Sequence, residues 1–283
     1  MSEISAAAVK SLRDRTNAPM MECKAALTEA KGNMDAAIDL LRKKLSNVAA
    51  GKAAREAAEG RVGAYIDEGK KVGAVVEVRC ESAPVAKTEQ FVKLADELAR
   101  HIVAKNPASV EELMAQPTLD DPKKTVADRI TDLVGLIREN MKVARFKRLE
   151  GLLGSYCHHD GSVGVLLQVE GKDTADAQLL RDVCMHITAR SPQAARREDV
   201  PSATLDKEKE IARSQVAADP KNANKPANIV EKILEGKLNT WFADNVLVDQ
   251  LFVKDDTKSV GAVLQGAGVK VVQFVRLKVG ELT

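Results

Sequence analysis

The first 46 residues carry apolar side chains at helical spacing in three short segments. Ser5 is placed to cap the first segment, and Asn33 is placed to cap the third. Pro19 suits the first turn of the second segment, because the N–H that it lacks would have no intrahelical partner there. The pattern predicts a small three-helix bundle over residues 1–46, better suited to docking than to catalysis. Residues 47–60 are rich in alanine and charge and are predicted to form a linker or a partly helical spacer between modules.

A pattern of two short strands and one amphipathic helix then occurs twice along the chain. A shift of 91 positions, without a gap, aligns seven residues of the first copy with identical residues of the second. The segment His101–Pro107 corresponds to His186–Pro192, but here the shift is six positions smaller than 91. The first copy therefore has six additional residues between Val78 and His101, and the duplication predicts two related subdomains. The aligned pairs are Glu59/Glu150, Gly60/Gly151, Gly63/Gly154, Tyr65/Tyr156, Val72/Val163, Gly73/Gly164 and Val78/Val169.

Alternating and helical periodicities predict the elements of both copies. Each copy is expected to form a hairpin and then a helix, and residues 106–124, which contain three prolines, are expected to be irregular. Met141–Arg148 is expected to begin the first strand of the second copy. This divides the core into an N-subdomain, residues 61–140, and a C-subdomain, residues 141–283. The predicted strands are 62–66, 72–80, 143–157 and 163–170, and the predicted helices are 89–105, 125–138 and 174–190.

The last third of the chain begins with two charged helical segments that have few apolar positions. A polar loop bounded by prolines separates them, which predicts an antiparallel helical hairpin at about 203–241 that projects from the body. The whole pattern predicts an α+β fold: an N-terminal three-helix bundle, then a duplicated α+β core of antiparallel sheets with helices and the projecting hairpin. The predicted segments here are helices 203–218, 227–241 and 260–266 and strands 251–253 and 269–279.

Charge and composition restrict the class of protein. Lys+Arg 43 nearly balances Asp+Glu 41, and a net charge of +2 gives no general attraction to nucleic acid or acidic membranes. The 4 cysteines are widely spaced and form no CxxC pair, as in the reduced thiols of a cytosolic protein. No apolar run approaches the roughly 20 residues of a membrane helix. We therefore expect a cytoplasmic protein with no stable nucleic-acid partner and no membrane partner.

The sequence contains no phosphate-binding loop, nucleophile elbow or zinc-protease motif. His158 and His159 lie on a predicted turn beside Asp160, where a polar turn is favoured over a metal site because adjacent strand residues point to opposite faces. His101 and His186 occupy equivalent positions of the two copies and are interpreted as hydrogen-bonded, semi-buried side chains, not as groups that transfer protons. We therefore expect no catalytic residue, no cofactor and no metal.

Two adjacent methionines, Met20 and Met21, follow the break at Pro19. Both cannot face the small core of one bundle, so we expect one of them to be exposed. Methionine is an adaptable contact residue at binding surfaces. The alternative is that both side chains are half-buried at the start of the helix.

Four motifs are spread along the chain: Val9-Lys-x-Leu-Arg-x-Arg-Thr-x-Ala-x-Met-Met-x-Cys-Lys-x-Ala-Leu27, Val78-x-Cys80 with Val85-Ala-Lys87 and Phe91, Gly154-Ser-Tyr-x-His158, and Val275-x-x-x-Val-Gly-Glu281. In this order they resemble the bacterial elongation factor Ts family over essentially the whole chain. The first motif is long and specific. The resemblance implies a UBA-like N-terminal bundle, that is, one similar to ubiquitin-associated domains, and a two-part core that carries a projecting helical hairpin.

The resemblance also implies a function, that of a translation elongation factor acting as guanine nucleotide exchange factor for the GTPase EF-Tu. Such a factor binds EF-Tu·GDP, disturbs Mg²⁺ and promotes GDP release through a nucleotide-free complex, so that GTP can bind. Where the family usually has Thr-Asp-Phe-Val in its exchange loop, this chain has Ala83 in place of the acid and Pro84 in place of the aromatic wedge. The implied contacts with EF-Tu are Arg13, Met20 and Met21, the exchange loop Ser82, Ala83, Pro84 and Val85, and a further contact at His158.

Two other functions stay open. The basic run Arg138–Arg148 suggests an RNA- or ribosome-associated binding protein, whose affinity for RNA would fall steeply with salt. Acidic residues interleave with this run, and no aromatic stacking platform accompanies it. The changed loop suggests the second alternative, a protein that binds EF-Tu with weak or no exchange activity.

Overall fold

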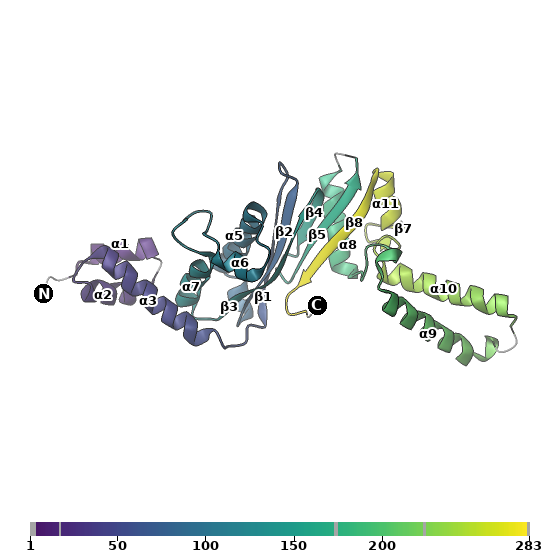
Figure 1. Cartoon of the computed structure of the whole chain (residues 1–283), viewed down its shortest axis with the longest axis horizontal. Coiled ribbons are helices and arrows are strands. Elements are labelled where there is room, and N and C mark those ends of the chain that lie inside the picture. Colours follow the sequence, from purple (N-terminus) through teal and green to yellow (C-terminus); the bar gives the residue numbers. More distant parts are fainter. Residues whose placement is uncertain (1–3, 17, 173–174, 223–224, 282–283) are drawn as a thin grey trace.

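The computed structural model describes residues 4–16, 18–172, 175–222 and 225–281. Figure 1 shows an elongated molecule with a helical bundle at the N-terminal end, the sheets in the middle and a helical hairpin at the far end. Helices and antiparallel sheets follow one another as the sequence predicts, so the α+β fold class is confirmed.

The N-terminal bundle is formed by the caps that the sequence predicts. The Ser5 hydroxyl accepts a hydrogen bond from the Ala8 N–H at 3.2 Å, and the Asn33 side chain accepts one from the Ala36 N–H at 3.0 Å. A core of small and aliphatic side chains fills the space between the helices. The helices are α1 (Ala6–Thr16), α2 (Met20–Glu29) and α3 (Met34–Lys52).

Helix α3 continues beyond residue 46 and occupies about half of residues 47–60, which agrees with the alternative of a partly helical spacer. Alanine favours the helix strongly enough to carry it through Gly51, which costs about 1 kcal/mol relative to alanine. Leu45 of α3 is buried against Gly135 of α7 (Val126–Ile137), where a Cβ would lie 2.2 Å from Leu45 Cδ2 and 2.9 Å from its Cβ. The bundle therefore packs directly on the core.

The first sheet has the strand order β1-β2-β3 and is antiparallel throughout. Helix α5 (Glu89–Lys105) lies against it with the predicted apolar face, because Phe91, Leu94, Leu98 and Ile102 are all buried. The segment predicted to be irregular contains a short helix, α6, whose first turn is capped by Ser109. The strands and this helix are β1 (Glu59–Asp67), β2 (Val72–Cys80), β3 (Met141–Glu150) and α6 (Val110–Ala115).

Strand β3 belongs to the first sheet, so the prediction that Met141–Arg148 begins the second copy is wrong. Val76 of β2 pairs with Phe146 of β3, and the chain leaves the sheet at Gly151, whose φ of +113° glycine adopts readily. The break between the sheets therefore lies at Gly151 and not at residue 140. The predicted strand 143–157 is in fact two strands, β3 and β4 (Leu152–Cys157).

The second sheet repeats the first, with the strand order β4-β5-β8. Its pairing is irregular between Gln168 and Val169, 91 positions after the irregularity between Glu77 and Val78 in the first sheet. The third strands of the two sheets, β3 and β8, therefore correspond as well. The predicted start of the following helix, Thr174, lies outside the described residues. The elements are β5 (Val163–Gly171), α8 (Ala177–Arg190), β6 (Leu251–Phe252), β7 (Asp255–Ser259), which was not predicted, α11 (Val260–Gly266) and β8 (Val269–Lys278).

The helical hairpin consists of α9 (Ser202–Ala218) and α10 (Ala227–Asn245), close to the predicted bounds. Few of its side chains are buried, and α10 has no buried residue among those described. Figure 1 shows the hairpin extending away from the second sheet. Arg197 stacks on Phe242 and forms an ion pair with Asp249 at 2.8 Å, which fixes the base of the hairpin to the body.

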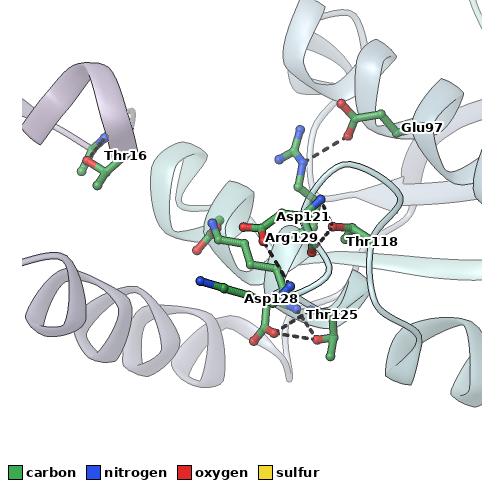
Figure 2. A network of polar contacts seen from close by, with 11 residues as sticks. Thr16, Glu97, Thr118, Asp121, Thr125, Asp128 and Arg129 are labelled. Carbon is green, nitrogen blue, oxygen red and sulfur yellow. Dashed lines mark hydrogen bonds and ion pairs between the residues drawn. The ribbon is translucent and has the colours of Figure 1, made fainter. Parts of the chain in front are cut away.

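The loop before α7 is held by a polar network, shown in Figure 2. Thr125 and Asp128 form a capping box at the start of α7. Arg129, one residue further, forms an ion pair with Glu97 of α5 at 3.1 Å. Helix α7 is therefore fixed to α5 at its first turn and to α3 near its end.

His101 and His186 are hydrogen-bonded, as predicted, but both are fully buried and not semi-buried, and each bonds to a glutamine. His101 Nε2 lies 2.9 Å from Gln116 Oε1, and His186 Nε2 lies 2.8 Å from Gln250 Oε1. The Val253 N–H donates to His186 Nδ1 at 3.3 Å, so this ring is the neutral tautomer with its proton on Nε2.

Burial lowers the pKa of His101 and of His186 below the ordinary value of 6.5. As the pH falls below 6.5, each histidine therefore takes up a proton in the unfolded state but not in the folded state. We expect the free energy of unfolding to decrease in this range by up to about 1.4 kcal/mol per pH unit for each histidine. Urea titrations between pH 7.5 and 5.5 measure this slope. The double variant His101→Gln/His186→Gln should lose most of it, whereas His159→Gln, at an exposed position, should keep it. An unchanged slope in the double variant would contradict the prediction.

Candidate partner-binding site

Helix α2 presents two methionines to solvent. Met20 is 47% exposed and Met21 is 74% exposed, so the alternative in which both are half-buried is wrong. The reason is local, because the buried face of α2 is formed by Cys23, Ala26 and Leu27, and Met20 and Met21 lie outside that face. Arg13 is exposed on the neighbouring helix α1. Exposed methionines and an exposed arginine on the neighbouring helix are residue types suited to contact with a protein partner.

The predicted exchange loop is a one-turn helix, α4 (Ala83–Ala86). Proline is favourable in the first turn of a helix, since its ring fixes φ and no N–H is lost from the ladder. Ala83 and Pro84 are exposed, Val85 is half-buried, and Ala86 packs into the core. The turn lies in the interval between Val78 and His101 where the first copy has its six additional residues. The predicted loop is thus a helical turn that follows β2 and exposes Ala83 and Pro84.

Ser82, at the start of this turn, is held by the carboxylate of Glu139. The Ser82 hydroxyl donates to Glu139 Oε1 at 2.6 Å, and its N–H donates to Oε2 at 3.1 Å. The Cys80 thiol donates to the Ser82 carbonyl at 3.3 Å, and burial raises the pKa of that thiol to about 11, so the thiol stays protonated. The Ser82 hydroxyl thus points toward Glu139, while Ala83 and Pro84 face solvent.

A second carboxylate, Glu81, lies directly before Ser82 and is also held by a hydrogen bond. The Asn140 N–H donates to Glu81 Oε1 at 2.6 Å, and this bond lowers the pKa of the Glu81 carboxyl. The side-chain amide of Asn140 (Nδ2) donates to the backbone carbonyls of Arg55, at 2.7 Å, and Ala53, at 3.3 Å. The end of β2, the start of β3 and the chain after α3 therefore meet beneath α4.

The third predicted position, His158, lies on the turn between β4 and β5. Its Nδ1 is 3.2 Å from the Tyr156 hydroxyl, and its ring meets the edge of His159 at 4.3 Å between centroids. Among the described residues, no hydrogen bond or ring contact joins His158 to α2 or α4. Nor do three His, Cys, Asp or Glu side chains of the described chain lie close enough together to hold a metal ion.

Sequence reasoning missed the residues that hold α4, above all Glu139 and Asn140. Glu139 lies 57 positions after Ser82, and neither periodicity nor the duplication marks it. Glu81 could have been noticed, since it directly precedes the predicted loop.

The exposed methionines and the fixed turn are features of a protein that acts by binding another protein. No helix among the described residues is long and apolar enough to cross a membrane.

Comparison with known proteins gives the family. A family model described as Elongation factor TS matches residues 84–281. The chain is 44% identical over 282 residues to an Elongation factor Ts from Thioalkalivibrio sulfidiphilus, which covers 98% of this chain and 92% of that protein. Identity is 42% over 286 residues with the protein of that name from Methylococcus capsulatus, covering 98% and 92%, and 40% over 289 residues with that from Clostridium kluyveri, covering 98% and 93%. The chain belongs to the elongation factor Ts family.

This membership confirms the main prediction from the sequence, a translation elongation factor that exchanges guanine nucleotide on EF-Tu.

Proposed function

We propose that this protein binds EF-Tu·GDP through α2 and places α4 beside the nucleotide, where the turn disturbs Mg²⁺ and releases GDP. The factor then stays bound to the nucleotide-free GTPase until GTP enters. The physical basis is linkage: a partner that binds the nucleotide-free state more tightly than the GDP state weakens GDP by the same factor. The protein performs no chemistry of its own, and it acts in the cytoplasm on a protein partner.

The observation that supports this proposal best is the position and stiffness of α4. It projects from the end of β2 with Ala83 and Pro84 exposed, and hydrogen bonds to Glu81 and Glu139 hold its base. A preorganised projection loses little conformational entropy on docking. Without an acid and an aromatic ring, the turn acts through its backbone shape and the proline ring.

The test is the release of a fluorescent GDP analogue from cognate EF-Tu, followed in stopped flow with an excess of unlabelled nucleotide. The full chain at micromolar concentration is expected to accelerate release many-fold, and the rate should saturate with its concentration. An unchanged release rate at every concentration would refute the proposal.

Substitution of the exposed methionines is expected to weaken the complex. Met20→Asp/Met21→Asp should raise the Kd for EF-Tu about tenfold or more, as truncation of interface anchors does. The free energy of unfolding should change by less than about 0.5 kcal/mol per position, because both side chains are exposed. Calorimetric titration measures the Kd. The control is Ala25→Asp, at an exposed position of the same helix, which should bind EF-Tu with the wild-type Kd. If the double methionine variant also binds with the wild-type Kd, the proposed contact is contradicted.

The alternative of RNA binding through Arg138–Arg148 finds no support in the geometry. Acidic partners occupy the arginines of this segment: Arg138 pairs with Glu22, Arg145 with Glu77 and Arg148 with Glu150. Paired guanidinium groups release few counterions on binding phosphate, so these three arginines add little affinity for RNA, and Lys142 and Lys147 are the exposed lysines of the segment.

A further inference from the structure

Three consecutive residues after α7 bind three different parts of the molecule. Helix α7 ends at Ile137, and Arg138 takes the left-handed conformation with φ of +65°. This turn sends successive side chains in different directions. Arg138 pairs with Glu22 on α2, Glu139 binds Ser82, and Asn140 binds Glu81 and the chain after α3.

Two of these contacts lie next to the surfaces proposed to meet EF-Tu. Glu22 directly follows Met21, and Ser82 directly precedes Ala83. The Glu22 side chain is only 13% exposed, so its ion pair with Arg138 is partly shielded from solvent. One short stretch of backbone therefore connects the methionine surface to the projecting turn.

Packing supports the same connection one turn earlier in α7. Leu45 of α3 lies so close to Gly135 that no side chain fits there. The bundle is thus held against α7 by an apolar contact and by an ion pair, on the same helix end that holds α4.

We propose that Arg138, Glu139 and Asn140 are positioning residues for nucleotide exchange. They fix α4 relative to the Met20–Met21 surface, so that binding through the bundle delivers the turn to the nucleotide site in one orientation. This inference rests on the proposed function. Its physical reason is that the rate of a process that depends on orientation can fall up to about a hundredfold when the acting group is misplaced by about 1 Å.

The decisive variant is Glu139→Ala, which removes both acceptors of Ser82 and leaves the exposed side chains Met20, Met21 and Pro84 unchanged. The maximal rate of GDP release at saturating factor is expected to fall about tenfold or more, while the half-saturating concentration changes less than about threefold. Glu139→Gln keeps one acceptor for the Ser82 hydroxyl and should fall in between. A merely structural role would predict no such separation between maximal rate and half-saturation.

The matched control is Asp128→Ala on the same helix. It removes the capping box of α7 but no contact to α4, and it should keep the maximal rate of the wild type. Gly135→Ala is the complementary variant, since it separates the bundle from α7 and leaves every side chain of both surfaces in place; it should lower the maximal rate as well.

Hydrogen exchange on the free protein tests the positioning without EF-Tu. The amides of Ala86 and Thr88, which bond within the α4 turn, should exchange faster in Glu139→Ala and at the wild-type rate in Asp128→Ala. A wild-type maximal rate or unchanged protection in Glu139→Ala would overturn the inference and leave the exchange function standing. No acceleration by the wild-type chain would instead overturn the proposed function itself.

Discussion

Replacing Glu77 with alanine is expected to lower the free energy of unfolding by about 3–5 kcal/mol, the cost of breaking a buried ion pair from one side. Glu77 is fully buried at the irregular point of β2. Its Oε1 accepts from Arg79 Nε at 2.7 Å and from the Gly280 N–H at 3.0 Å, and its Oε2 accepts from Arg145 Nε at 2.6 Å. Removing the carboxylate leaves two guanidinium groups, which are less than one-fifth exposed, without their anion.

Urea unfolding at neutral pH measures this loss, and Glu150→Ala is the matched control. The Glu150 side chain pairs with Arg148 but is 67% exposed, so its removal should cost less than about 1 kcal/mol. Glu77→Gln keeps acceptor oxygen and imitates Gln168, the residue at the same place in the second copy; it should cost less than alanine. Similar losses for Glu77→Ala and Glu150→Ala would show that burial does not govern this cluster.

The cluster around Glu77 also contributes a contact between the two sheets. Arg145 donates to the Lys278 carbonyl at 3.1 Å, so strand β3 of the first sheet is tied to the end of β8 in the second. A small apolar cluster between the sheets, which includes Val62 and Leu166, adds to this connection. Lys278 and Gly280, at the C-terminal end of the second copy, thus form hydrogen bonds with residues of the first sheet.

Local patterns were sufficient for the elements that depend on local chemistry. Helix α5 has the predicted bounds because its apolar stripe is wide and Thr88 caps its first turn. The same reasoning failed for β3, since an alternating pattern does not say which sheet a strand joins. That choice depends on the long connection through α5, α6 and α7, which returns the chain to the free edge of β2.

The candidate site divides in the same way. The exposure of Met20 and Met21 follows from the size of the local core, and the duplication located α4 by the six residues that one copy has and the other lacks. The support beneath α4 comes from Glu139, which the fold alone brings to Ser82. Residues that present a surface were therefore predictable, and residues that hold it in place were not.

Restoring the family residues in the turn, with Ala83→Asp/Pro84→Phe, is expected to make the binding free energy for EF-Tu more favourable by about 2 kcal/mol. This corresponds to a Kd about thirtyfold lower. Both positions are exposed in the free protein, so the added side chains cost little in the fold. An aromatic ring that becomes buried in an interface contributes this much, whereas loss of the proline costs only about 0.4–1 kcal/mol in chain entropy. The gain in binding free energy from the aromatic ring is therefore larger than the entropy cost of losing the proline.

Pro84→Ala separates the two effects, because it removes the ring constraint and adds no wedge; its Kd should rise by the smaller amount. Calorimetry with nucleotide-free EF-Tu gives the affinities, and release of fluorescent GDP gives the rates. If the wild-type chain already exchanges at the rate of the double variant, the alternative of an EF-Tu-binding protein without exchange activity fails. If the double variant binds no better than Pro84→Ala, residues 82–85 do not contact the partner, and the assignment of α4 as the exchange element is wrong.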